Sequence, residues 1–95
     1  MSLLDLTERL CAIPSVSGDE RALADFVEAR LRERAEALEI TRFANNVVAR
    51  TTGSAPTRVV LGGHLDTVPA NGNAQPRREG GMLHGLGSAD MKGGL

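Results

Sequence analysis

The stretch "GGHLDTVP", residues 62–69, places a histidine and a carboxylate two positions apart, directly after the most apolar run of the chain. That run, Val59 to Leu61, consists of β-branched and aliphatic residues, which predicts a strand buried on both faces. Residues i and i+2 of a strand point to the same side, so we expect His64 and Asp66 to face one common space. Ligands of open α/β sheets bind beyond the carboxyl ends of strands, where this pair is expected to lie.

A histidine beside a carboxylate is a frequent arrangement around metal ions. The second nitrogen of a metal-bound imidazole commonly hydrogen-bonds a carboxylate, which fixes the tautomer and makes the ligand more basic. His64 and Asp66 supply such a pair within three residues. An isolated His-x-Asp is more often a strand-end histidine bonded to backbone, with a turn that begins at Asp66, so these residues alone favour that structural interpretation over a metal site.

A second candidate is "GLGSAD", Gly85 to Asp90. Its glycines let the backbone turn sharply and leave Asp90 at the start of a predicted helix. One carboxylate can bridge two cations, which in dinuclear hydrolases lie about 3.5–4 Å apart. Asp90 by itself could also be a plain helix N-cap. A dinucleotide site is disfavoured, because Asp90 replaces the third glycine of that fingerprint and would repel a pyrophosphate.

The first two segments of the chain are predicted to be helices. Residues 2–13 carry leucines and an isoleucine spaced by three and four, and Pro14 ends this segment. The second helix lies within residues 15–38, where Ser17 and Glu20 form a Ser-x-x-Glu capping box. Its many Arg and Glu side chains are interpreted as a solvated face.

Short strands are expected after these helices. "LEITRF" and "NVVAR" form an antiparallel pair joined by the turn residues Asn45 and Asn46, and residues 59–64 form a central strand. A long polar connection, residues 70–81, precedes the glycine-rich turn. Helices followed by strands predict an α/β layered fold.

Composition limits the possible partners and surroundings. The chain has 95 residues, enough for one domain at most, with 41% hydrophobic and 24% charged residues, as in globular proteins. A net charge of -1 and only 2% aromatic residues argue against nucleic acid as a partner. No apolar stretch approaches the roughly 18 residues of a membrane span. The single cysteine, Cys11, is expected to be buried, and the acid at Asp5 argues against a signal peptide, so we expect a cytoplasmic protein.

Taken together, the two motifs carry a specific resemblance. "GGHLDTVP" followed by "LHGLGSADMKGG" resembles the paired signatures of the dinuclear zinc amidohydrolases, which include acetylornithine deacetylases, glutamate-releasing carboxypeptidases, aminoacylases and succinyl-diaminopimelate desuccinylases. "IPSVSGDE" and "NNVVARTT" stand in the order and at the spacing of the actinobacterial desuccinylases. The resemblance covers almost the whole chain.

The resemblance implies a role for each site residue. His64 would ligate one zinc, Asp66 would orient His64, and Asp90 would bridge two zinc ions, with cobalt as a possible substitute. It also favours a cis peptide at Asp90-Met91, which could relax to trans in a fragment. Leu86 departs from the family, because many relatives carry arginine there. The metal ligands do not depend on that arginine.

The resemblance also implies an incomplete domain. Residues 1–95 would be the N-terminal portion of a three-layer zinc-hydrolase catalytic domain, with two helices, an antiparallel strand pair, a central strand and a glycine-rich turn. The general base, the remaining ligands and a dimerisation domain would lie beyond residue 95, and the parent enzyme would be a homodimer.

The implied activity is hydrolysis of an N-acyl amino acid. The expected substrate is N-succinyl-diaminopimelate, cleaved to succinate and diaminopimelate for lysine and cell-wall precursors. Acetylornithine deacetylase, a carboxypeptidase or dipeptidase, and a non-catalytic interaction module remain alternatives. We expect the 95-residue chain alone to be inactive and to hold zinc weakly or not at all. His84 is expected to cap a strand end. Arg77, Arg78 and Lys92 could attract an acidic substrate, but they are expected to be solvated loop charges.

Overall fold

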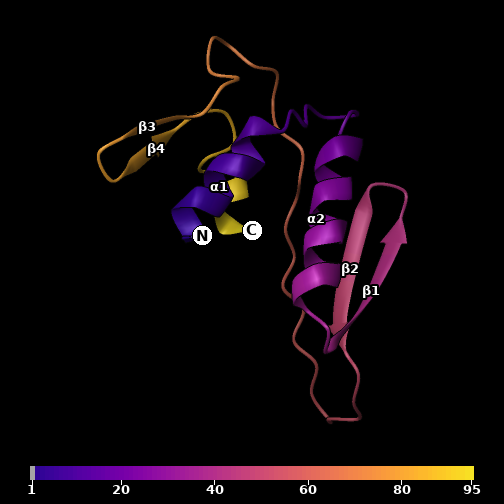
Figure 1. The fold of residues 1–95 in the computed structure, drawn as a ribbon. Coiled ribbons are helices and arrows are strands. Elements are labelled where there is room, and N and C mark those ends of the chain that lie inside the picture. The colour runs from indigo at the N-terminus through magenta and orange to yellow at the C-terminus, as the bar shows by residue number, and fades with distance from the viewer. Residues whose placement is uncertain (1) are drawn as a thin grey trace. The chain divides into compact units, whose positions relative to one another are not determined.

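A computed structural model describes residues 2–95 and gives two helices, two strand pairs and one short 3-10 helix (Figure 1). In chain order the elements are α1 (Leu3–Ala12), α2 (Arg21–Arg34), β1 (Leu38–Phe43), β2 (Asn46–Thr51), β3 (Arg77–Glu79), β4 (Met82–His84) and η1 (Lys92–Gly94). They fall into two compact units. The site unit contains the chain up to Leu23 together with Gly63–Leu95, and the hairpin unit is Ala24–Gly62. The expected α/β content is confirmed.

The first predicted helix is present as α1, and it begins with a capping box that was not predicted from the sequence. The Ser2 hydroxyl accepts a hydrogen bond from the Asp5 amide at 3.1 Å, and the Asp5 carboxylate accepts one from the Ser2 amide at 3.0 Å. These contacts satisfy amide groups that a helix start leaves without intrahelical partners. Toward the end of the helix, Leu10 and Cys11 are buried, so the expected burial of the cysteine is confirmed.

Lys92, in η1, belongs to the core of the site unit. It is 3% exposed, and its ammonium group donates to the main-chain oxygen of Ile13 at 2.7 Å. The expectation of a solvated charge at Lys92 is therefore wrong. The glycine-rich turn brings η1 against α1 (Figure 1). Burial lowers the pKa of Lys92 and raises the pKa of the Cys11 thiol, and the charge interaction between the two groups opposes both shifts.

The strands β3 and β4 form a hairpin that pairs Arg77 with His84 and turns at Gly80-Gly81. This hairpin lies partly within the predicted polar connection, and that prediction is wrong for residues 77–79. The strand "RRE" carries no apolar alternation, so periodicity could not identify it. His84 ends β4 as expected.

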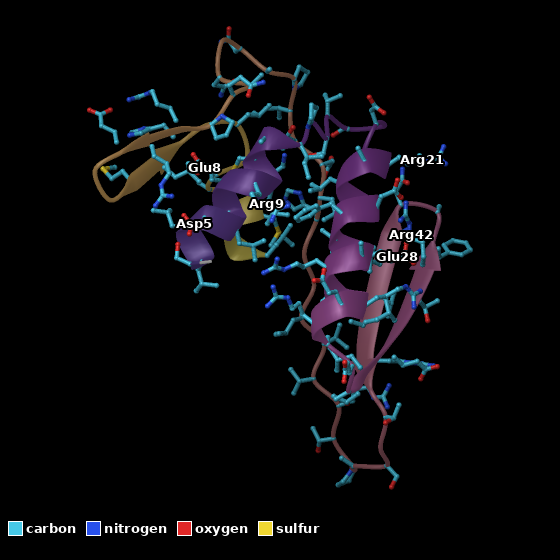
Figure 2. All side chains as sticks on the ribbon, viewed as in Figure 1. Asp5, Glu8, Arg9, Arg21, Glu28 and Arg42 are labelled. Carbon is cyan, nitrogen blue, oxygen red and sulfur yellow. The ribbon has the colours of Figure 1, made fainter. Side chains whose placement is uncertain are left out.

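The arginines of β3 are paired. Arg78 contacts Asp5 at 2.6 Å and Glu8 at 3.6 Å, both on α1, and Arg77 contacts Glu79. Figure 2 labels the two acids on α1. The expectation that Arg77 and Arg78 lie in a loop is therefore wrong, whereas the Arg77 side chain is 63% exposed and solvated as expected. These contacts connect β3 to α1 within the site unit.

The second helix is shorter than predicted. α2 begins at Arg21 and ends at Arg34, and the predicted Ser17–Glu20 capping box is wrong. Ser17 lies too far before the helix to cap it. Its hydroxyl donates to Asp66, while the Glu20 carboxylate accepts from the Gly18 amide at 2.6 Å.

The hairpin unit contains the predicted antiparallel pair. β1 and β2 pair from Leu38 with Thr51 to Phe43 with Asn46. The turn comprises Ala44 and Asn45, with Ala44 at φ 52, so Asn46 is the first strand residue rather than a turn residue.

Charges join α2 to β1 within this unit. The Arg42 guanidinium lies 2.9 Å from Asp25 and 3.0 Å from Glu28 on α2 (Figure 2). Arg32 contacts the other carboxylate oxygen of Glu28 at 3.0 Å. Part of the charged face of α2 is therefore an ion-pair network rather than a fully solvated surface.

The predicted central strand is wrong. Residues 59–64 are irregular, and Val59, Val60 and Leu61 are 79%, 82% and 95% exposed. A strand needs a hydrogen-bonded neighbour, and each of the four strands in the described chain pairs within its own hairpin. The apolar run consequently has no strand beside it in residues 2–95. No helix in this range is long and apolar enough to cross a membrane.

Candidate metal site

The segment Ser15–Ser17 holds the loop that carries His64 and Asp66. Val16 and Thr67 form an isolated parallel bridge. The Thr67 amide donates to the Ser15 oxygen at 2.9 Å, and the Ser17 amide donates to the Thr67 oxygen at 3.0 Å. The buried Ser15 hydroxyl donates to the Leu65 oxygen at 2.8 Å. Backbone pairing at Thr67 and the Ser15 hydroxyl at Leu65 therefore fix the loop on both sides of Asp66.

His64 faces Asp66, as the alternation predicted. Its Nδ1 lies 3.1 Å from the main-chain oxygen of Asp66 and 3.1 Å from the carboxylate Oδ1 of the same residue. The other carboxylate oxygen, Oδ2, accepts the hydrogen bond from the Ser17 hydroxyl. Asp66 is thus held between a serine and the imidazole.

Asp90 lies on the opposite side of the same imidazole. Its Oδ1 is 3.0 Å from His64 Nε2, although the two residues are 26 positions apart. The predicted convergence of His64 and Asp90 is confirmed. The His64 amide donates to the Met91 sulfur at 3.1 Å, and the Asp90-Met91 peptide bond is cis.

The glycine-rich turn delivers Asp90 to this position. Gly87 has φ +82, and a Cβ there would lie 3.0 Å from the Thr67 methyl group. A Cβ on Gly93 would lie 2.2 Å from the main-chain oxygen of Ser88, which no real structure tolerates. The Lys92 amide closes the turn by donating to the Gly87 oxygen at 2.8 Å. Glycine is required at these positions for conformation and for close approach.

The three residues line an open cavity of about 540 Å³. Ser17 and Leu86 also line it, so Leu86 presents an apolar side chain to the cavity. The side chains of His64 and Asp66 are 48% and 40% exposed, whereas Asp90 is 88% exposed. Asp90 can therefore receive a ligand from solvent without displacing other protein groups.

Local contacts shift the ionisation of the site. Desolvation lowers the pKa of His64, but its hydrogen bonds to the Asp66 main chain and the Asp90 carboxylate, with both negative charges, outweigh this and raise the pKa overall. The Ser17 hydroxyl has the largest effect on Asp66 and lowers the pKa of its carboxyl group, assisted by His64 and opposed by desolvation. The site favours a positive charge at the imidazole between two carboxylates.

The donor set fits a cation between His64 and Asp90. Two acceptor oxygens of Asp66 lie beside Nδ1 and one oxygen of Asp90 lies beside Nε2, which favours the neutral tautomer with its proton on Nδ1. Nε2 then presents a lone pair to Asp90 Oδ1 at 3.0 Å. Two acceptors at this distance require a proton or a metal ion between them. His64 and Asp90 are two ligands only. In residues 2–95, no group of three or more His, Cys, Asp or Glu side chains that could hold a metal ion is present.

Sequence reasoning identified His64, Asp66 and Asp90 but missed Ser17 as a member of the site. Its contact with Asp66 spans 49 positions. The spacing of Ser17 and Glu20 matched a helix cap, and no short-range pattern connects Ser17 with Asp66. "IPSVSGDE" had entered the family resemblance only as a matching segment.

Both motifs lie in a region that is similar to a known protein family. Residues 60–95, which contain both motifs, match the profile of Peptidase family M20/M25/M40. A Mycobacterium tuberculosis (strain H37Rv) protein provisionally named succinyl-diaminopimelate desuccinylase is 53% identical over 91 residues, which are 96% of this chain and 26% of that protein. The chain resembles the N-terminal part of these enzymes.

Two further relatives extend the comparison. The succinyl-diaminopimelate desuccinylase of Corynebacterium glutamicum is 48% identical over 91 residues, 95% of this chain and 25% of that enzyme. A [LysW]-lysine hydrolase of Deinococcus radiodurans is 41% identical over 93 residues, 96% of this chain and 24% of that enzyme. The chain thus spans about a quarter of the length of the curated relatives it matches.

Proposed function

We propose that this chain carries the N-terminal part of the metal site of a zinc-dependent amidohydrolase. The observation that supports the proposal is the convergence of His64 Nε2 and Asp90 Oδ1 at 3.0 Å, with Asp66 behind the imidazole. Imidazole nitrogen and carboxylate oxygen are ordinary zinc ligands. The M20/M25/M40 match over residues 60–95 covers the same motifs.

Each residue has a distinct role in this proposal. His64 would hold one zinc ion through Nε2, Asp90 would be the ligand shared by two zinc ions, and Asp66 would keep the proton on His64 Nδ1. Zinc bound in a hydrolase polarises the scissile carbonyl and lowers the pKa of water toward neutrality. Cobalt is a possible substitute. The three-layer catalytic domain and the homodimeric assembly of a longer parent enzyme are part of the same proposal.

The proposed reaction of that parent is hydrolysis of N-succinyl-diaminopimelate to succinate and diaminopimelate. The desuccinylase names of the relatives at 53% and 48% identity support this substrate. The [LysW]-lysine hydrolase at 41% identity favours testing other N-acylated amines as a second candidate class. A panel of N-succinyl, N-acetyl and aminoacyl amides, assayed on the longest natural product of this gene, separates these activities. Turnover of none of them would contradict the proposal.

The isolated chain should bind zinc weakly at one site and hydrolyse nothing. A catalytic zinc usually has three protein ligands, whereas His64 and Asp90 supply two. We expect isothermal titration calorimetry to show one weak site that is lost in His64→Ala. His84→Ala is the matched control, because His84 ends β4 and should leave zinc binding unchanged. Tight binding of two zinc ions by the isolated chain, or binding that survives His64→Ala, would contradict the assigned ligands.

A further inference from the structure

We propose that Ser17 is a positioning residue that holds Asp66, and through it His64, in the orientation required at the metal site; this inference builds on the proposed function. The Ser17 hydroxyl donates to Asp66 Oδ2, while Asp66 Oδ1 lies 3.1 Å from His64 Nδ1. The two oxygens of one carboxylate are thus engaged by different residues. Ser17 acts on the imidazole only through Asp66.

This double engagement restricts rotation of the Asp66 carboxylate. Its side chain is 40% exposed, so water can compete for its oxygens. With Oδ2 fixed by Ser17, Oδ1 remains directed at His64 Nδ1. Loss of the hydroxyl would let the carboxylate turn toward solvent, and His64 would then keep its proton on Nδ1 less often.

The serine side chain itself starts from a fixed position. The Ser17 amide donates to the Thr67 oxygen at 3.0 Å, and the neighbouring Val16 bridges to Thr67. An alanine retains this backbone pairing and removes the hydroxyl, which contacts Asp66 and, at 3.4 Å, the Thr67 main-chain oxygen. Ser17→Ala therefore leaves the backbone attachment of the loop in place while it removes the contact with Asp66.

The Asp90 carboxylate competes with Asp66 for the proton of the neutral His64 ring, and this competition can be measured. If the Asp66 carboxylate turns away, Nδ1 keeps only the Asp66 main-chain oxygen as an acceptor, and the neutral ring can more often place its proton on Nε2 and donate to Asp90 Oδ1, which already lies 3.0 Å away. The ratio of the two tautomers of His64 therefore reports the position of Asp66. This chain has only two histidines, so long-range ¹H–¹⁵N NMR spectra resolve each ring.

The experiment measures this ratio on the 95-residue chain without metal, under alkaline conditions where the rings are neutral. Ser17→Ala should shift the ratio toward the Nε2–H form by roughly 3- to 10-fold, the change that one net hydrogen bond supports. Ser17→Thr should restore the wild-type ratio. Ser88→Ala, at a serine lining the same cavity, is the control and should leave it unchanged. An unchanged ratio in Ser17→Ala would overturn the inference.

A double-mutant cycle covers the case in which Ser17→Ala perturbs the fold. If Ser17 acts through Asp66, the serine substitution should have no further effect on the His64 ring in an Asp66→Asn background. Additive effects would show that Ser17 acts by another route and would overturn the inference. The tautomer experiment contains no metal, so its result does not depend on zinc binding. A chain that fails to bind zinc would contradict the proposed function. The tautomer ratio would still decide the role of Ser17.

Discussion

Contacts within the site unit join residues that lie farther apart along the chain than contacts within the hairpin unit do. In the hairpin unit, Arg42 contacts Glu28 and Asp25 at separations of 14 and 17 positions. In the site unit, the Ser17–Asp66, Arg78–Asp5 and Lys92–Ile13 contacts span 49, 73 and 79 positions. Short loops close at a lower entropic cost than long ones. The site unit therefore depends on tertiary contacts that the hairpin unit does not need.

The two units also differ in what they bury. The site unit contains Leu10, Cys11, Leu23 and the polar residues Ser15, Thr67 and Lys92 among its buried side chains, whereas Ala24 is the buried residue of the described hairpin unit. Close packing makes a core sensitive to one added methyl group, while exposed ion pairs tolerate change. Substitutions in the site unit should consequently have the larger effects.

The largest difference is expected at Gly93. Gly93→Ala places a Cβ 2.2 Å from the Ser88 oxygen, a backbone atom that cannot move aside as a flexible side chain would. We expect a loss of about 2–3 kcal/mol in the free energy of unfolding, measured by urea denaturation. Amide hydrogen exchange should show the loss around η1, while the amides of β1 and β2 remain protected.

Gly94→Ala is the matched control for this substitution. Its Cβ would lie 3.5 Å from the Met91 methyl group, an ordinary contact, so stability should change little. The predicted difference between the units would be contradicted if Gly93→Ala and Gly94→Ala reduced the free energy of unfolding equally. It would also be contradicted if Gly93→Ala reduced amide protection equally in both units.

A smaller, pH-dependent effect is expected at Asp5, which connects α1 with β3. Its hydrogen bond with the Ser2 amide, followed by that with Arg78, lowers the pKa of Asp5 from 3.8 to about 2. A carboxyl group with a lower pKa in the folded state stabilises the fold fully above its unfolded pKa. That contribution should be lost as the pH falls from about 4 toward 2.

Far-UV circular dichroism at decreasing pH measures the loss of α1. Asp5→Asn should weaken the helix at neutral pH and remove this part of the acid sensitivity. Glu36→Gln, in the exposed turn before β1, serves as the control for one lost carboxylate and should keep the wild-type acid profile. An Asp5→Asn variant with an unchanged profile would contradict the assigned contacts.

The smallest effect is expected in the hairpin unit. Arg42→Met removes the ion pairs with Asp25 and Glu28 and should reduce the free energy of unfolding by roughly 0.5–1 kcal/mol. Salt screens partly exposed ion pairs, so this difference should shrink at high ionic strength. Arg50→Met breaks a 3.6 Å pair with Glu39 whose side chains are both more than half exposed, and it should have almost no effect. If Arg42→Met lowered the free energy of unfolding as much as Gly93→Ala, the expectation of larger effects in the site unit would be contradicted.

The sequence by itself determined the local elements and the identity of the site residues. Apolar spacing and a proline defined α1, and alternation with a short polar turn defined β1 and β2, because these signals act between near neighbours. His64 and Asp66 were expected on one side of the chain, and "GLGSAD" suggested Asp90 as their partner. Each of these expectations depends on a few consecutive residues or on a resemblance to known motifs.

Tertiary structure alone decided which distant groups meet. Ser17 resembled a helix cap, yet its hydroxyl holds Asp66, and Lys92 was expected in solvent, yet its ammonium group is buried against Ile13. The apolar run at residues 59–61 predicted a strand, but a strand exists only where a neighbour completes its hydrogen bonds. Local sequence encodes what a residue can do, whereas these outcomes depend on partners 49 and 79 positions away, or on the presence of a pairing strand.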